Sequence, residues 1–176
     1  MPLNPCRIVV IGITSSGKST LASKLSLQLG IPFIDTDALF WAPNWQKAAD
    51  FAAKMTRAIE TPTWALAGHF TTMKDVIYTR AQVVVWLDYS LWTVFWQLLR
   101  RCFYRWWTQE LLWGTNRESM WTHLKVWSNE SLIHWLFKNY ARIRREYPNA
   151  LAKHPHLQIF RFRHPRETQA WLDSIA

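Results

Sequence analysis

The chain has 176 residues, of which 49% are hydrophobic and 19% are charged, and its formal net charge at pH 7 is +9. This length fits one sizeable core with room for an insertion, and the composition excludes an intrinsically disordered chain. The positive charge is concentrated, because residues 100–166 contain thirteen Lys or Arg against four Glu and no Asp. Such a segment suits nucleotide phosphates, nucleic acid or an acidic lipid surface, although a basic helix can also be an ordinary solvated face.

The N-terminal stretch, the apolar stretches and the cysteines indicate the cellular compartment of the protein. The N-terminal stretch MPLNPCRIVV lacks the basic leader and long apolar core of a secretion signal, and the longest apolar stretches, such as LWTVFW, are too short for a bilayer. Cys6 and Cys102 lie far apart among apolar residues, without metal-ligand spacing. We therefore expect buried thiols, no membrane and a reducing, cytoplasmic location.

Segments typical of strands and helices alternate along the first part of the chain. Residues 6–11 form a strand-forming run, apolar except for Arg7, that ends at Gly12, as in a buried parallel strand. Residues 18–29 have apolar side chains at helical spacing, and Gly30 ends that helix. The segment IPFID predicts a second short strand, and residues 46–60 predict a helix that TPT stops.

Three further strand-like runs follow, at residues 64–67, 82–87 and 157–162, with helical segments between them. This alternation predicts an α/β fold with a mainly parallel five-stranded sheet. The interval 90–147 is almost wholly helical in character and rich in tryptophan. We interpret it as a helical lid-type insertion over the ligand edge of a single domain, residues 1–176.

The turn after the first predicted strand carries a phosphate-binding pattern. The stretch GITSSGKS, from Gly12 to Ser19, matches G-x-x-x-x-G-K-[ST] at every fixed position. The glycines let backbone N–H groups point at phosphate oxygens, and the helix start adds its positive end. Lys18 is expected to reach the β and γ phosphates and Ser19 to give a hydroxyl to Mg²⁺, within a three-layer P-loop NTPase fold. The expected nucleotide-binding residues are Gly12, Thr14, Ser15, Ser16, Gly17, Lys18, Ser19 and Thr20.

Two carboxylates follow the second predicted strand, Asp35 and Asp37. In a parallel sheet they lie at the same edge as the phosphate loop, where ligands of open α/β sheets bind. Either one could bind a hydroxyl or base of an acceptor, or orient water on Mg²⁺. Either one could equally be a turn residue or a helix N-cap.

Arginines accumulate in the segment that follows. Arg101 and Arg105 are one helical turn apart and share a helix face. Phosphoryl transfer needs such cations, because negative charge spreads over the transferred group and a closing lid excludes water. Each arginine can also be a solvated surface residue. The candidates are Arg100, Arg101, Arg105, Arg117, Arg142, Arg144 and Arg145.

Blocks along nearly the whole chain resemble a family of small P-loop proteins of the nucleoside monophosphate kinase type, the adenylate-kinase-like or DNA topology modulation proteins. The blocks are GITSSGKSTLASKL, GIPFIDTDALFWAPNW, VVVWLDYSLWTVFWQLLRR, WGTNRES and FRHPRE. The first is shared by many ATPases and GTPases, whereas DALFWAPNW and NRES are more particular.

The resemblance implies transfer of the γ-phosphoryl group of Mg·ATP to a nucleotide or another small acceptor. It implies that Lys18, Arg101, Arg105 and Arg117 act in catalysis, with Arg100 also among the lid arginines, and that Asp37 binds the acceptor. It places Arg163, His164 and Pro165 against the adenine ring. No guanine-reading N-K-x-D pattern is present, which favours ATP over GTP. The oligomeric state is left open.

The chain departs from the family after the third main strand. Relatives in that family read Asp-Gly-Asn-Tyr, whereas this chain reads Ala67-Gly68-His69-Phe70. That aspartate helps to hold Mg²⁺ through water, so its loss predicts weaker catalysis unless Asp88 or Asp35 substitutes for it. His69 could contact the acceptor or be a surface turn residue.

Thirteen tryptophans are present, and some are interleaved with arginine, as in RRCFYRWW. Most are expected to pack, since Trp92 and Trp96 lie four residues apart on an apolar helix face. Base stacking is the alternative, and it leads to a second hypothesis: an ATP-binding module with little turnover that associates with nucleic acid. A membrane-surface protein is a third class, for which LIHWLFKNYARIRREY is only a partial match.

Overall fold

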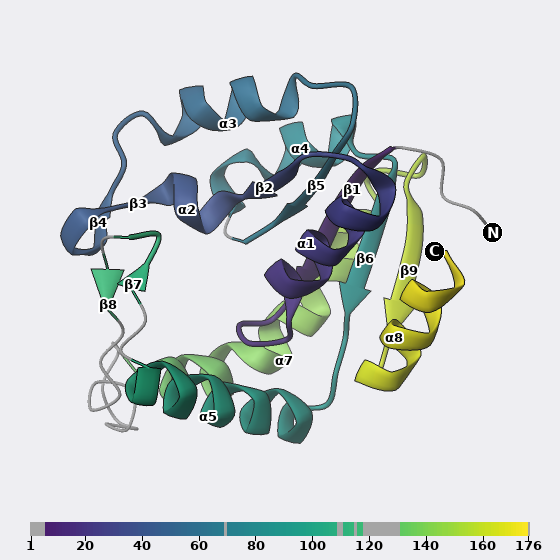
Figure 1. The fold of residues 1–176 in the computed structure, drawn as a ribbon. Coiled ribbons are helices and arrows are strands. Elements are labelled where there is room, and N and C mark those ends of the chain that lie inside the picture. Colours follow the sequence, from purple (N-terminus) through teal and green to yellow (C-terminus); the bar gives the residue numbers. More distant parts are fainter. Residues whose placement is uncertain (1–5, 69, 109–110, 115, 118–130, 176) are drawn as a thin grey trace.

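Five strands form one parallel sheet at the centre of the molecule (Figure 1). The computed structural model describes residues 6–68, 70–108, 111–114, 116–117 and 131–175. The strand order is β2-β5-β1-β6-β9, and every pairing within this sheet is parallel. The predicted five-stranded parallel sheet is therefore confirmed. The strands are β1 (Arg7–Gly12), β2 (Phe33–Asp35), β5 (Trp64–Ala67), β6 (Val83–Leu87) and β9 (Gln158–Phe162).

Strand β1 is buried because it lies in the middle of the sheet with helices on both sides. Its neighbours are β5 and β6, and Ile8 pairs with Ala65 on one side and Val83 on the other. Ile8 and Val10 point into one hydrophobic cluster, and Val9 and Ile11 into a second one on the opposite face. A strand covered on both faces needs apolar residues throughout, which explains the unbroken run in the sequence.

Helices cover both faces of the sheet and complete a three-layer α/β fold (Figure 1). One face packs against α1, α5, α8 and the first part of α7, and the other against α3, α4 and the end of α7. The helices are α1 (Lys18–Leu29), α2 (Thr36–Phe40), α3 (Phe51–Ile59), α4 (Lys74–Arg80), α5 (Leu91–Thr108), α7 (Leu132–Leu151) and α8 (Pro165–Ser174).

Short elements connect the main ones. Strands β3 and β4 pair antiparallel around a 3-10 turn, and β7 and β8 also pair antiparallel. The prediction of one helix over residues 46–60 is wrong at its start, because Gln46 and Lys47 belong to β4 and the helix begins at Phe51. These elements are β3 (Trp41–Ala42), η1 (Pro43–Trp45), β4 (Gln46–Lys47), η2 (Thr71–Met73), β7 (Leu111–Leu112) and β8 (Asn116–Arg117).

The tryptophan-rich interval contains more than helix. It includes α5 and most of α7, but β7 and β8 lie between them, so the expectation of an almost wholly helical block over 90–147 is wrong for residues 111–112 and 116–117. Both helices also contribute to the core, α5 through Val94 and Leu98 and α7 through Leu136. These helices are therefore part of the layer that covers the sheet.

The tryptophans divide between core and surface. Trp64 and Trp86 are buried in the sheet, as expected for packing. Trp92 and Trp96 are not, since 66% and 59% of their surfaces are exposed, so the prediction that this pair packs in the core is wrong. Their helix face is apolar but points outward, because the opposite face, with Val94, already meets the core.

Both cysteines are free and buried, as predicted from their apolar neighbours. Burial raises the pKa of the Cys6 thiol, which disfavours the reactive thiolate. Among the described residues, no helix combines the length and the apolar character that crossing a membrane requires.

Candidate functional site

The phosphate loop lies between the buried end of β1 and the start of α1. A β-carbon on Gly12 would lie 2.6 Å from Ser16 Oγ and 2.9 Å from the Leu87 carbonyl oxygen, so only glycine fits there. Gly17 caps α1 with φ at +91°, a backbone conformation that glycine adopts without strain. The motif residues therefore form the bent loop that the sequence predicts, followed directly by a helix N-terminus.

Lys18 folds back over this loop. Its ammonium group donates a hydrogen bond to the Ile13 carbonyl oxygen at 3.0 Å. The pKa of Lys18 is lowered to about 8, mainly by burial; the negative charge of Asp37 partly opposes this shift, and the positive charge of Arg101 adds to it. Asp37 of α2 and Arg101 of α5 therefore both lie close enough to Lys18 of α1 to affect its charge.

Two buried hydroxyl groups of the loop are available to bind a ligand. Within the described part of the chain, the buried hydroxyls of Ser15 and Ser16 have no hydrogen-bond partner. A buried polar atom without a partner costs free energy, so such atoms indicate a missing ligand or water. Ser19 lies in the first turn of α1 and is partly exposed, while Thr20 is exposed. Polyphosphate oxygens fit this arrangement of unpaired hydroxyls and helix N-terminus.

The side chain of Tyr147 contacts the start of the phosphate loop. This α7 residue donates a hydrogen bond from its hydroxyl to the Gly12 carbonyl oxygen at 3.3 Å. Burial raises the pKa of Tyr147 to about 12, so the hydroxyl keeps its proton and remains a donor throughout the neutral range. Its ring also contacts the Trp86 ring, with 5.7 Å between centroids. Nothing in the motif indicated this contact, which spans 135 residues of sequence.

Asp35 and Asp37 lie at the end of β2, at the same edge of the sheet as the phosphate loop. Asp35 caps α2: its Oδ1 accepts hydrogen bonds from the backbone N–H groups of Asp37 and Ala38, at 3.1 and 3.4 Å. Of the two roles left open for Asp35, the structure thus shows the N-cap. Asp37 is partly buried in the first turn of α2.

At Gly68, the end of β5 packs closely against the start of α2. A β-carbon at this position would lie 2.5 Å from Thr36 Oγ1 and 3.0 Å from Asp37 Cγ, and φ is +116°. The end of β5 therefore presses against the N-terminus of α2 and fixes the position of Asp37. His69, a candidate acceptor contact, lies outside the described residues.

The candidate arginines do not gather at one point. Arg101 is partly buried and acts on Lys18, and Arg105, one turn further along α5, is also partly buried. Arg100 is exposed on the other side of α5. Arg117 belongs to β8, next to β7 and paired with Leu111. Arg142 and Arg145 are exposed on α7.

Two sequence blocks that are far apart meet beside Asp35. The Asn116 side chain accepts a hydrogen bond from the Trp45 backbone N–H at 3.0 Å and donates one to the Ala42 carbonyl oxygen at 3.1 Å. The Trp113 indole N–H donates to Asp35 Oδ2 at 3.1 Å. Hence the β7–β8 hairpin is fastened to the β3–β4 hairpin and to the end of β2.

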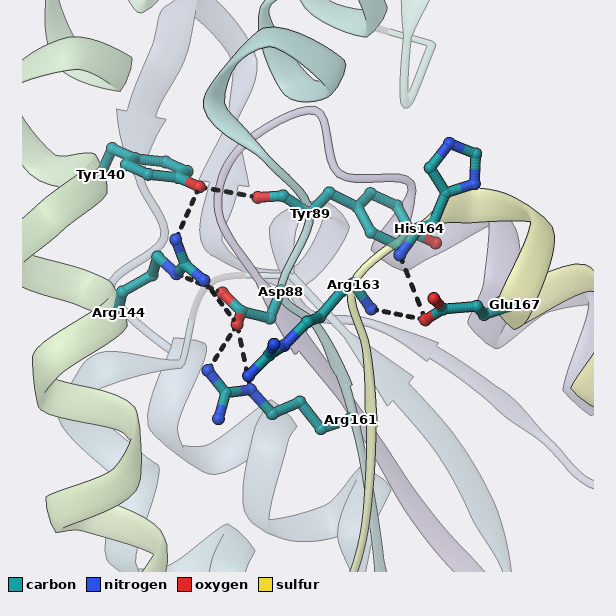
Figure 2. A network of polar contacts seen from close by, with 8 residues as sticks. All are labelled: Asp88, Tyr89, Tyr140, Arg144, Arg161, Arg163, His164 and Glu167. Atoms are coloured by element: carbon teal, nitrogen blue, oxygen red, sulfur yellow. Dashed lines mark hydrogen bonds and ion pairs between the residues drawn. The ribbon is translucent and has the colours of Figure 1, made fainter.

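The side chain of Asp88 is the centre of an ion-pair network at the end of β6 (Figure 2). Arg144 from α7 and Arg161 from β9 both contact its carboxylate, at distances down to 2.6 Å. The Asp88 side chain is only 1% exposed, against 40% for each arginine. The ion pair raises the pKa of Arg144. Because both carboxylate oxygens face guanidinium groups, nothing in this geometry favours Asp88 as a magnesium ligand.

The network extends to aromatic side chains (Figure 2). Arg144 donates to the Tyr140 hydroxyl at 3.1 Å, and that hydroxyl donates to the Tyr89 carbonyl oxygen at 2.9 Å. The Arg161 guanidinium lies over the Trp86 ring, 4.2 Å from its centroid. The network thus joins β6, β9 and α7 beside the phosphate loop. Arg144 was grouped with the lid arginines in the sequence, but here it has a structural partner.

Arg163, His164 and Pro165 form the turn from β9 into α8. The Glu167 carboxylate accepts hydrogen bonds from the backbone N–H groups of Arg163 and His164, at 2.9 and 3.3 Å (Figure 2). The His164 ring nitrogen caps the helix by accepting a hydrogen bond from the Arg166 N–H. This capping box fixes the turn next to Asp88 and Tyr89. The turn lies at the carboxyl end of β9, at the same sheet edge as the phosphate loop.

Comparison with known proteins identifies P-loop kinases as relatives. No family model matches the chain. A shikimate kinase from Synechococcus sp. (strain JA-3-3Ab) is 32% identical over 110 residues, which cover 53% of this chain and 58% of that protein. A shikimate kinase from Paramagnetospirillum magneticum (strain ATCC 700264 / AMB-1) is 35% identical over 51 residues, covering 29% and 26% of the two chains. The chain thus matches less than two thirds of the length of these curated relatives.

Solved structures of small-molecule kinases share the whole fold. Shikimate kinase from Bacteroides thetaiotaomicron superposes with a TM-score of 0.57 at 12% identity, covering 97% of this chain and 96% of that one. Shikimate kinase from Acinetobacter baumannii in complex with shikimate gives 0.54 at 16% identity, with 97% and 90% covered. A gluconokinase from Sinorhizobium meliloti 1021 gives 0.51 at 17% identity, with 98% and 94% covered. The expected three-layer P-loop fold is therefore confirmed.

Proposed function

We propose that this protein is an ATP-dependent P-loop kinase that phosphorylates a small acceptor. The observation that carries the proposal is the placement of Lys18 on the phosphate loop, bonded to the Ile13 carbonyl oxygen and within electrostatic reach of both Asp37 and Arg101. A cation for the phosphates, a carboxylate for the acceptor and a second cation for the transferred charge are the parts that phosphoryl transfer requires. The curated relatives, which are shikimate kinases, support the same reaction class.

Each residue has a distinct task in this proposal. The loop N–H groups and the Ser15 and Ser16 hydroxyls bind phosphate oxygens, and Lys18 moves from the Ile13 carbonyl oxygen to the β and γ phosphates. Arg101 stabilises the charge that develops on the transferred group. Arg105 and Arg117 are proposed to assist it from α5 and β8. Thr14, Gly17 and Thr20 complete the phosphate-binding backbone.

Magnesium is proposed to bind through Ser19 and the phosphates themselves. Across the described residues, no group of three His, Cys, Asp or Glu side chains could hold a metal ion. That fits Mg²⁺, which keeps most of its waters and takes few protein ligands when phosphates are present. The ion would neutralise phosphate charge when bound. Asp35 remains a candidate for holding one of its waters, since its Oδ2 lies at this sheet edge, where it accepts a hydrogen bond from the Trp113 indole N–H.

The acceptor is proposed to bind beside Asp37. A carboxylate accepts hydrogen bonds from hydroxyl groups, and Asp37 is half-buried and within electrostatic reach of Lys18. Shikimate and gluconate, named by the similar kinases, are the first acceptors to test, followed by nucleoside monophosphates. The base of the donor is proposed to be adenine, lying against the turn formed by Arg163, His164 and Pro165.

The test is a transfer assay with γ-labelled ATP, Mg²⁺ and a panel of shikimate, gluconate, sugars, nucleosides and nucleoside monophosphates. We expect one acceptor class to become labelled, and we expect Asp37→Asn to reduce that transfer at least about tenfold while the protein still binds ATP. Glu60→Gln, an exposed carboxylate on α3's C-cap, is the matched control. Transfer to no acceptor, by folded protein that binds ATP, would contradict the kinase assignment.

A nucleic-acid role in the manner of the DNA topology modulation proteins is the second proposal. It rests on the sequence blocks and on the concentration of Lys and Arg in residues 100–166. The relatives reported above are small-molecule kinases and lend it no support. Binding through several phosphates would weaken steeply as salt increases, whereas mononucleotide binding in the loop would weaken less. A fluorescence titration with single-stranded DNA at two salt concentrations separates the two.

The location of the protein also remains a proposal. The kinases it resembles and the two free, buried cysteines fit a reducing compartment, and we propose the cytoplasm. Fractionation of cells that produce the full-length protein tests this directly.

A further inference from the structure

The outer face of α5 exposes a line of aromatic side chains that the kinase proposal does not use. The exposed fractions are 66% for Trp92, 59% for Trp96, 58% for Phe103 and 73% for Trp107. In Figure 1, α5 runs along one edge of the molecule. Its other face, with Val94, Leu98 and Cys102, is buried in the core. Large side chains that gather on one exposed face mark an interaction surface rather than scattered surface residues.

The spacing of these four side chains along α5 is symmetric: it is the same from either end of the helix. The intervals are four, seven and four residues, and their midpoint lies between Leu99 and Arg100. Two copies of such a helix, packed antiparallel around a two-fold axis at that midpoint, therefore present matching residues to each other. Trp92 meets Trp107 of the second copy, and Trp96 meets Phe103 of the second copy. We propose that this face of α5 joins two copies of the chain in a symmetric dimer.

The surface of α5 also has a hollow that could receive a side chain of the second copy. Arg100, Phe103, Tyr104 and Trp107 line a hollow on this helix. Their spacing is i, i+3, i+4 and i+7, which is the four-residue hole that receives one side chain from a facing helix in knobs-into-holes packing. In the antiparallel register, the residue opposite this hole is Trp96 of the second copy. Symmetry then fills two such holes, one on each copy.

The area involved is enough for a stable dimer. An aromatic side chain buries about 150–250 Å² when fully covered, so four that are roughly 60–70% exposed supply about 400–600 Å² per copy. Leu99, Arg100 and Tyr104 extend this along a helix about 27 Å long, towards the roughly 800 Å² per partner of an ordinary interface.

The charge of this face favours a second copy over nucleic acid or an anionic membrane. Helix α5 has no Asp or Glu, and of its three arginines only Arg100 is exposed beside the aromatic line. Arg101 and Arg105 are partly buried on the side of Val94, Leu98 and Cys102. Phosphate-bearing partners are bound by several cations, whereas protein interfaces combine aromatic residues with few charges and with single arginines.

Sedimentation equilibrium of the full chain at micromolar concentrations tests the dimer. We expect a monomer–dimer equilibrium, and we expect Trp96→Glu and Phe103→Glu each to weaken it at least about tenfold, because each places a charge in the centre of the interface. Leu27→Glu, at an 81% exposed apolar residue of α1, is the matched control and should leave the equilibrium unchanged. Circular dichroism establishes that each variant is folded. A wild-type protein that is monomeric at all concentrations overturns the proposal.

The salt dependence of association and disulfide cross-linking distinguish this antiparallel dimer from binding to DNA or membranes and from dimers with another register. Each copy carries a net charge of +9 and Arg100 meets its own mate at the axis, so added salt should strengthen the dimer, whereas it would weaken binding to DNA or anionic vesicles. Arg100→Cys should form an intermolecular disulfide on oxidation. Tyr104→Cys should not, because its mate is displaced by about 13 Å along the helix, beyond disulfide reach. Equal cross-linking of both variants, or association that salt disrupts, would refute the proposed register.

Discussion

At the scale of single residues, the most informative side chain is Lys18. It is buried against the loop, bonded to the Ile13 carbonyl oxygen, and its pKa is lowered to about 8. The loop therefore holds this lysine close to the point where it loses its charge. A bound polyphosphate supplies negative charge that favours the protonated form, so ligand binding and protonation of Lys18 are linked.

This linkage predicts proton uptake on nucleotide binding. Near pH 9 the Lys18 amine of the free protein is largely neutral, so binding of ATP should draw a proton from the buffer, and ATP affinity should fall as the pH rises through about 8. Calorimetry in buffers of different ionisation enthalpy measures the uptake. Lys18→Arg keeps a permanent charge and should show almost none of it. Equal uptake by both proteins would show that another group titrates.

A second prediction concerns Gly68, where a β-carbon would collide with Thr36 and Asp37. Gly68→Ala should lower the free energy of unfolding by about 2–4 kcal/mol, because it adds a clash to an unfavourable φ. Gly30→Ala is the control, since its φ is also positive but the space around it is open, and it should cost only about 1 kcal/mol. Urea denaturation compares them, and similar losses would argue against a tight contact between β5 and α2.

Residues of the phosphate loop could be named from the sequence because a fixed local spacing carries their chemistry. Residues that support them could not. Tyr147 reaches Gly12 across 135 positions, and Trp113 reaches Asp35 across 78. The sequence did single out the blocks that contain Trp45 and Asn116 as distinctive, but only the fold shows that these two residues touch.

At the scale of elements, α7 is joined to the sheet by the Asp88 network. Its Arg144 and the Arg161 of β9 share one buried carboxylate at the end of β6. The same helix places Tyr147 on the loop at Gly12. Helix α7 therefore determines where the phosphate loop and the strand ends lie relative to one another.

The Asp88 network predicts that replacing Asp88 destabilises the protein much more than replacing Asp50. Asp88→Asn should lower the free energy of unfolding by about 2–3 kcal/mol, since it leaves two guanidinium groups without a counter-charge; their partial exposure keeps the loss at the lower end for buried pairs. Asp50→Asn, which breaks an exposed pair with Lys54, should cost less than about 0.5 kcal/mol. Thermal denaturation measures both, and comparable losses would count against the network.

Elements were predictable where burial determines the pattern. The strands β1, β5, β6 and β9 appear as apolar or strand-forming runs, and each is found within a residue or two of its predicted bounds. The start of α3 was missed because Gln46 and Lys47 pair with β3 through a contact that periodicity does not report. The orientation of α5 was missed for a similar reason. Its aromatic and its aliphatic faces are both apolar, and only packing selects Val94 and Leu98 for the core.

At the scale of the whole molecule, the parallel sheet brings every candidate group to one edge. The phosphate loop follows β1, Asp37 follows β2, Gly68 follows β5, Asp88 follows β6 and the capped turn at His164 follows β9. This edge is where α/β folds bind ligands. The strand order could not be read from the sequence, because it depends on which crossovers pass β1.

Direct measurement of ATP binding tests the central claim that the loop between β1 and α1 binds a polyphosphate. Equilibrium dialysis of the full chain against labelled Mg·ATP, beside Lys18→Ala and the exposed control Lys54→Ala, is the decisive experiment. We predict saturable binding by the wild type and by Lys54→Ala, and a loss of at least about tenfold in affinity for Lys18→Ala. Failure of the folded wild type to bind millimolar ATP or GTP, or equal binding by Lys18→Ala, would contradict it.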